Sequence, residues 1–169
     1  MRSGRAALLA LILLAGCRRS SDTAAAAASA GGRLEQAAIA AGLVVDPSSR
    51  SIVGAWSLDT DRACIVPAAR GDDARIGLLI DYGQGQGCAA SGTIRRSGSD
   101  RLDVRLGDCR VAARFEGERI VFPAEVSAAC DRLCTGRATL AAMTVERQSE
   151  SVAEAQSLRA PGGRPLCAN

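Results

Sequence analysis

Apolar and polar side chains alternate with a period of two through the middle of the chain. The alternating segments are 52–58, 75–82, 101–106, 110–116 and 118–123, and two further strands are expected around Cys64 and over 88–94. Such alternation is typical of half-buried antiparallel strands, and Gly, Asp and Ser cluster at the breaks where turns are needed. Because the turns are short, the pattern predicts a mainly β fold, a small up-and-down antiparallel barrel or sandwich of 7–8 strands with short flanking helices.

The pattern is helical on both sides of the strands. Leu34, Ala38 and Ala41 fall on one helix face, and Gly42 is a natural helix end. Ser151 and Glu154 have the spacing of a capping box, which predicts a helix to about Arg159. We therefore expect a short helix and turn over 34–50, a β domain over 51–147, and a short helix with a tail pinned by Cys167 over 148–169. The segment 137–147 fits an eighth strand or a helix, because Leu140, Met143 and Thr144 also permit helical spacing.

The N-terminus carries its own pattern. Two arginines within residues 1–5 precede an apolar run that ends in Leu14-Ala15-Gly16-Cys17, with small residues before the cysteine. Such a run is typical of a secretory signal and is too short to span a bilayer as a helix. Its last four residues resemble the lipobox of bacterial lipoproteins. The resemblance implies removal of a signal peptide, residues 1–16, and acylation of Cys17, which anchors the chain to the membrane.

The lipoprotein resemblance also implies a location. An Asp after the acylated cysteine retains members of this class at the inner membrane, whereas Arg18 stands here. We therefore expect a cell-envelope protein held at the outer membrane and facing the periplasm. Residues 17–33 are rich in Ala, Ser and Gly and are predicted to be a low-complexity tether.

Six further cysteines follow the lipobox. They are Cys64, Cys88, Cys109, Cys130, Cys134 and Cys167. An even number in an exported chain predicts three disulfides, whose pairing the sequence leaves open; metal binding at Cys130-x3-Cys134 is the alternative. These bonds compensate for a scarcity of aromatic side chains, among which Trp56 has the parity of a core residue.

The order of the turns predicts where the cysteines lie. In an up-and-down meander, Cys64, Cys88 and Cys109 each follow a turn at the same end, and the strand over 118–123 delivers Cys130 and Cys134 to that end. The turns around Asp72, Arg96 and Glu116 should then occupy the opposite end. Arg95 and Arg96 are expected there as solvated edge charges, with a weak contact to an anionic surface as the alternative.

Charge and composition narrow the function. The chain has 21 basic residues, all Arg, against 18 acidic residues and no His, and Arg2 and Arg5 leave with the signal. This near-neutral balance argues against nucleic acid as a partner. Catalytic dyads that need His are excluded, and no nucleophile elbow or carboxylate pair at a catalytic spacing is present. We expect a monomer that is not an enzyme, with no cofactor and no bound metal.

One loop is a candidate for recognition. Gly83-Gln84-Gly85-Gln86-Gly87 lacks the spacing and the following helix of a phosphate-binding loop. It fits a mobile hairpin loop or, alternatively, a recognition loop in which Asp81, Tyr82, Gln84 and Gln86 supply the contacts.

Two inhibitor families are similar in outline. Gly54-x-Trp56-x-Leu58, followed by a strand that bears Cys64, resembles the start of the small periplasmic β-barrel metalloprotease inhibitors. The lysozyme-inhibitor lipoproteins offer a comparable small barrel. The sequence thus favours a non-catalytic, lipid-anchored envelope lipoprotein that binds an envelope protein or cell-wall component or serves a structural role. The alternative is an inhibitor of an envelope-active hydrolase, either a protease or a lysozyme.

Overall fold

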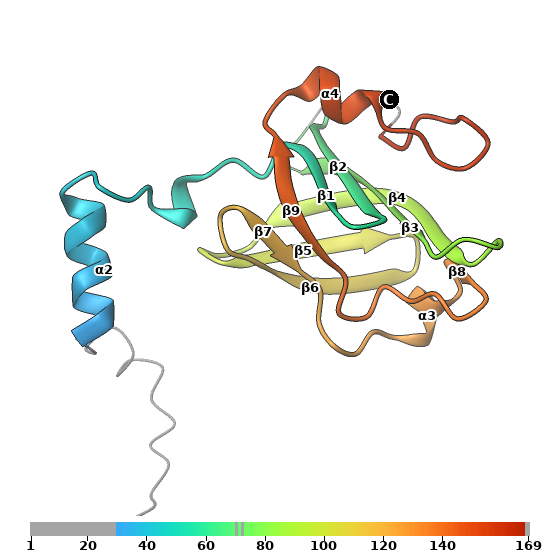
Figure 1. Cartoon of the computed structure of the whole chain (residues 1–169), viewed down its shortest axis with the longest axis horizontal. Helices are drawn as coiled ribbons and strands as arrows, with labels where there is room; N and C mark the ends of the chain where they lie inside the picture. The colour runs from blue at the N-terminus through green and yellow to red at the C-terminus, as the bar shows by residue number, and fades with distance from the viewer. Residues whose placement is uncertain (1–29, 70, 72, 168–169) are drawn as a thin grey trace, which may run out of the picture. The chain divides into compact units, whose positions relative to one another are not determined.

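The computed structural model describes residues 30–69, 71 and 73–167 (Figure 1). The chain divides into two units, and the boundary between them falls after Val44. The predicted signal peptide, Cys17 and most of the predicted tether lie outside the described residues.

The first unit contains helix α2, Ala30–Ala40, which begins at Ala30 rather than at the predicted Leu34. Its end follows the prediction from Gly42. Gly42 has a φ of 70°, its N–H donates to the Ile39 carbonyl, and the Leu43 N–H donates to the Ala38 carbonyl, both at 2.9 Å. These two bonds form a Schellman motif, which satisfies the last helix carbonyls and turns the chain sharply.

The second unit is a closed antiparallel barrel of eight strands with one additional strand, as the alternation predicts (Figure 1). The barrel strands are β1 (Gly54–Leu58), β2 (Asp61–Pro67), β3 (Ala74–Asp81), β4 (Gly87–Arg96), β5 (Arg101–Leu106), β6 (Cys109–Phe115), β7 (Arg119–Val121) and β9 (Thr144–Ser149). Strand β9 lies between β1 and β7 and closes the barrel. The additional strand, β8 (Cys134–Thr135), pairs with the start of β4.

Short helical segments flank the strands. They are η1 (Pro47–Ser49), α3 (Ala128–Asp131) and α4 (Val152–Ser157). Helix α4 begins as the capping pattern predicts, because the Ser151 hydroxyl accepts a hydrogen bond from the Glu154 N–H at 3.3 Å. Neither α3 nor β8 was expected from the sequence, since both are too short to produce a periodic pattern.

The barrel interior is filled by the inward-facing members of the alternating pattern. Trp56, the expected core residue, has no exposed surface, and its ring meets Phe115 edge-on at 6.2 Å between centroids. Aliphatic side chains from β2 to β6 fill most of the remaining space. A second, smaller cluster lies on the other side of β1 and β2, where Ala155 of α4 and Leu166 of the tail pack against the barrel wall.

The segment over 137–147 is neither of the two predicted structures over its whole length. Strand β9 begins only at Thr144, and the residues before it form turns. Ala142 has a φ of 57°, yet Leu140 is fully buried and Met143 is 3% exposed. Leu140 and Met143 therefore close one end of the barrel from within a turn. Side chains in a turn leave no regular period in the sequence, so the pattern over 137–147 was ambiguous.

Two disulfides lie at one end of the barrel, which we call the stapled pole. Cys109 is bonded to Cys130, and Cys88 is bonded to Cys134, with Cα–Cα distances of 4.7 and 4.1 Å. Cys130 and Cys134 flank the end of α3, so the single turn of this helix fastens β6 and β4 together.

The expectation that Cys64 joins this end was wrong. Cys64 is bonded to Cys167 and belongs to the small cluster outside the barrel wall. Its neighbours Ala63 and Ile65 face the core, so Cys64 faces the opposite way. It pairs with Gly77, whereas Ile80 is the partner of Cys88, so Cys64 lies farther along the barrel than the stapled pole.

The other end of the barrel, the arginine pole, is closed by Arg96 and Arg147. The Arg147 guanidinium lies 4.2 Å from the centre of the Trp56 ring and donates to the carbonyls of Ser51, Val53 and Gly117. Only 6% of the Arg147 side chain is exposed. Around it, Arg50, Glu118 and Glu150 complete an ion-pair network.

The description of Arg96 as a solvated edge charge was also wrong. Its guanidinium lies 4.4 Å from the centre of the Phe115 ring and donates to the carbonyls of Ser48 and Arg50 at 2.8 and 2.6 Å. Burial lowers the pKa of Arg96 from its ordinary value. Arg95, by contrast, has half of its side chain exposed and makes only long ion pairs.

Candidate functional site

The loop between β3 and β4 is a tight turn that projects from the barrel at the stapled pole (Figure 1). The Asp81 carboxylate accepts a hydrogen bond from the Gly83 N–H at 2.8 Å. The Tyr82 N–H donates to the Gln86 carbonyl and the Gln86 N–H donates to the Gly83 carbonyl, both at 2.9 Å. Gly83, Gln84 and Gly85 all have positive φ. Glycine adopts this conformation without steric cost, which explains why it stands on both sides of Gln84.

Strand β8 clasps this loop from the side. The Thr135 hydroxyl lies 2.7 Å from the Gly85 carbonyl and 3.2 Å from both the N–H and the carbonyl of Gly87. The Gln86 side-chain oxygen accepts a hydrogen bond from the Arg137 N–H at 3.3 Å. The Cys88–Cys134 disulfide lies directly beside these contacts. The loop is therefore fixed by a covalent bond and by polar contacts with Thr135 and Arg137.

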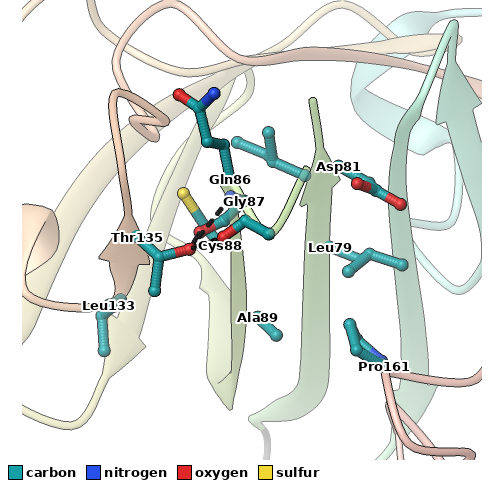
Figure 2. A pocket seen from close by; sticks show the side chains of 11 residues that line it. Leu79, Asp81, Gln86, Gly87, Cys88, Ala89, Leu133, Thr135 and Pro161 are labelled. Atoms are coloured by element: carbon teal, nitrogen blue, oxygen red, sulfur yellow. Dashed lines mark hydrogen bonds between the residues drawn. The ribbon is translucent and has the colours of Figure 1, made fainter. Parts of the chain in front are cut away.

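A hollow of about 420 Å³ opens between the clasped loop and the C-terminal tail (Figure 2). Leu79 and Ala89 are cross-strand partners on the outer face of β3 and β4, and they form its floor. Leu133 and Thr135 lie on one side of the floor and Pro161 on the other, as Figure 2 shows. Asp81 and Gln86 add a carboxylate and an amide to the lining.

A second hollow of about 320 Å³ continues along β4 and shares Ala89 with the first. Ser91 lines it from the strand, and Ala160, Arg164 and Leu166 line it from the tail. We call the two hollows together the β4 groove. It is a mainly apolar surface that has Asp81 in one hollow and Arg164 in the other.

The tail that forms one wall of the β4 groove is held close to the barrel. The Leu166 carbonyl lies against Gly77, where an added Cβ would be 2.4 Å from the carbonyl oxygen. Glycine is therefore required at this position because the two backbones almost touch. The Leu166 N–H donates to the Leu158 carbonyl at 2.9 Å, and the next residue, Cys167, is bonded to Cys64. The groove is thus bounded by a disulfide-fixed segment on each side.

Strand β4 has an unpaired edge along the groove. Strand β5 pairs with it from Thr93 onward, and β8 pairs with Gly87 and Cys88. Between these two contacts, Ala89–Gly92 pairs with β3 on one edge, and among the described strands none pairs with the other. Ala89 and Ser91 of this stretch line the groove. All four residues of this stretch are small, and Ala89 and Ser91 are exposed.

Of the four predicted recognition residues, the structure places two in the groove and two outside it. Asp81 and Gln86 line the first hollow, where Asp81 also caps the turn and Gln86 contacts Arg137. Tyr82 is 55% exposed, and neither Tyr82 nor Gln84 lines the hollows. Leu133, Thr135 and Pro161 were missed, because only the disulfide pairing, which the sequence left open, brings them to β4.

Few ionisable side chains line the groove among the described residues. Asp81 is its one carboxylate among the residues of both hollows. Within the described ranges, no group of three or more Cys, Asp or Glu side chains is arranged to hold a metal ion. Of the helices that the structure describes, none is long and apolar enough to span a membrane.

Comparisons with known proteins add no assignment. The chain matches no protein-family model, no curated protein and no solved structure. Its function is therefore inferred from the residues themselves.

Proposed function

We propose that this protein is a non-catalytic lipoprotein of the bacterial cell envelope that binds another envelope component in the β4 groove. The Cys17 lipid holds it at the outer membrane, where the barrel faces the periplasm. The observation that carries the binding role is the fixed groove beside the clasped Gly83–Gly87 loop. Pre-organised surfaces bind without a large ordering cost, which is the property that a recognition site needs.

The disulfides support the envelope location. All six cysteines after the lipobox are paired in three bonds, with sequence separations of 103, 46 and 21. Such bonds persist in an oxidising compartment and are rare in the cytosol. Two of them fix the walls of the groove, so the compartment and the binding surface are linked.

The anchor is tested by the mass of the N-terminal peptide from the membrane fraction. We expect a peptide that begins at Cys17 and carries the added mass of acyl chains. A Cys17→Ser variant should lose its tight association with the membrane. Retention of residues 1–16, or full membrane partitioning of the variant, would contradict the anchor.

The groove is tested by site-specific photo-crosslinking in the native envelope. A photoreactive residue at Ala89 should give a discrete adduct, and Ala89→Arg, which fills the groove, should abolish capture from a second position at Ser91. Ala112 on β6 is the matched control, because it too is an exposed alanine facing outward from a strand. Equal adducts from Ala89 and Ala112, or none from Ala89, would show that the groove is not the binding surface.

One observation favours inhibition of an envelope hydrolase as the second candidate. The clasped turn projects from the barrel and presents Tyr82, which is 55% exposed although its backbone is fixed. Rigid projecting turns that present an aromatic side chain fit enzyme clefts with little rearrangement. Purified protein would then inhibit lysozyme or a periplasmic protease, and Tyr82→Ala would weaken inhibition about tenfold or more. Val152→Ala, on the surface of α4, is the control.

A further inference from the structure

Helix α2 and the turn after it expose more apolar surface than a water-facing segment needs. Leu34, Leu43 and Val44 are 72%, 80% and 50% exposed, and no residue of the helix is buried within the described part of its unit. Large exposed apolar side chains that gather in one short segment mark a contact surface more often than a chance arrangement.

The backbone places these side chains together. Leu34 and Ala38 are four residues apart and lie on the same side of the helix. The Schellman motif returns the chain at Gly42 and bonds the Leu43 N–H to the Ala38 carbonyl, which brings Leu43 to the same side. Leu34, Ala38, Leu43 and the adjacent Val44 form what we call the apolar strip.

Charge does not oppose burial of this strip. Arg33 and Glu35 are the only charged residues in 30–44, and they cancel. Glu35 and Gln36 fall away from Leu34 around the helix. The segment is therefore amphipathic and electrically neutral, and its contact with a surface depends on apolar burial.

The length of chain before the helix identifies the occupant. Only residues 18–29 separate Cys17 from α2, and about 12 residues span at most roughly 40 Å even when fully extended. If Cys17 is acylated, the start of α2 stays within that distance of the lipid, and the 11 residues of the helix add only about 16 Å to the far end of the strip. We propose that the apolar strip lies in the interface of the same membrane, as a second lipid contact beside the acyl anchor. This inference rests on the anchor given under Proposed function.

The test uses the full mature protein in phospholipid vesicles whose acyl chains are brominated. Leu43→Trp introduces a fluorescent reporter, because the native Trp56 is fully buried and contributes a constant background. We expect a blue-shifted emission from this reporter that is strongly quenched by the brominated chains. Val152→Trp on α4 is the matched position on the barrel unit, where the native side chain is 36% exposed, and it should remain unquenched.

A second pair of variants separates burial from a general effect of mutation. In the Leu43→Trp protein, Ala38→Glu places a charge within the strip and should relieve quenching. Gln36→Glu adds the same charge on another side of the same helix and should leave quenching intact. A strip that contacts lipid predicts this difference, whereas a helix that is merely close to the membrane predicts equal behaviour.

The outcomes separate the inference from the proposed function. Mass spectrometry of the same sample reports whether Cys17 is acylated. An acylated protein whose reporter at position 43 is unquenched overturns the lipid contact and leaves the anchor intact. A blue shift without quenching means that the strip packs against the barrel or a second copy, and it overturns the inference as well.

Equal quenching at positions 43 and 152 overturns the assignment to this segment. If the acyl group is absent, the anchor fails, and quenching of the free protein by added vesicles decides the strip alone.

Discussion

The two ends of the barrel are closed by different chemistry. At the stapled pole, two disulfides and the single turn of α3 hold the ends of β4 and β6. At the arginine pole, Arg96 and Arg147 cover the rings of Phe115 and Trp56 and bind the carbonyls of the chain that enters the barrel. Covalent bonds mainly restrict the unfolded chain, whereas the arginine contacts exist only in the folded one. The free energy of unfolding should therefore change differently when a disulfide is removed from one pole and when an arginine is removed from the other.

Among the contacts that close the two poles, removal of the Cys88–Cys134 bond should have the largest effect. The bond closes a loop of 46 residues, so the chain-entropy relation gives a loss of about 4 kcal/mol in the free energy of unfolding for Cys88→Ala with Cys134→Ala. Denaturant titration measures the loss. Removal of Cys109–Cys130, which closes 21 residues, should cost about 3 kcal/mol. A larger loss for the shorter loop would show that strain or local packing, and not loop closure, governs the stapled pole.

Arg147→Ala should destabilise the protein by about 3 kcal/mol, because it uncovers Trp56 and leaves three carbonyls without their donor. Arg119→Ala is the control. It also removes an arginine paired with a glutamate, at 2.7 Å from Glu146, but that pair is exposed and should contribute less than about 1 kcal/mol. Equal losses in the two variants, measured by the same denaturant titration, would mean that Arg147 acts as an ordinary surface charge.

Arg96→Ala should cost about 1–2 kcal/mol and should increase hydrogen exchange in 48–50, whose carbonyls it binds. The adjacent Arg95→Ala should be nearly neutral, because Arg95 makes only long, exposed ion pairs. The two variants change the same residue type in the same strand. Similar exchange rates in both would remove Arg96 from the closure of this pole.

The smallest expected effect is a pH-dependent change in stability when Asp61 is replaced. Asp61 is the first residue of β2, and the residue after it pairs with Leu79 of β3. Burial and the nearby Asp59 carboxylate raise the pKa of Asp61 above its ordinary value of 3.8. The folded state therefore disfavours the carboxylate, so ionisation of Asp61 reduces stability at neutral pH. Asp61→Asn should raise the melting temperature slightly at pH 7, and the gain should vanish as the pH falls below 3.8. A gain that persists in acid would contradict a titration effect.

Local patterns were sufficient for the barrel and insufficient for its ends. The alternation along β5 and β6 reports burial directly, so the strands and their meander order were predictable. Arg96 and Arg147 have no local signal, because an arginine that covers an aromatic ring looks in the sequence like one that faces water. Leu140 was ambiguous for a similar reason, since a single buried side chain in a turn has no period.

The candidate site was predictable in the same partial way. Glycine at 83 and 85 indicated the tight turn, and Asp81 and Gln86 could be named from it. Thr135 and Pro161 reach β4 only through the pairing of cysteines far apart in the sequence. Cys64 shows the same limit, because counting turns placed it at an end of the barrel while its partner lies in the last residues.

The Cys64–Cys167 bond has a consequence for biosynthesis. Of the six cysteines after the lipobox, a chain made from its N-terminus presents Cys64 before the other five, and four thiols separate it from its partner Cys167. Oxidation in order of appearance would join Cys64 to Cys88, a bond that the finished barrel does not contain. Native pairing therefore requires that the Cys64 thiol stay reduced until Cys167 is available, or that a disulfide isomerase later exchange the early bond. Production in a host without such an isomerase should yield a mixture of oxidised isomers.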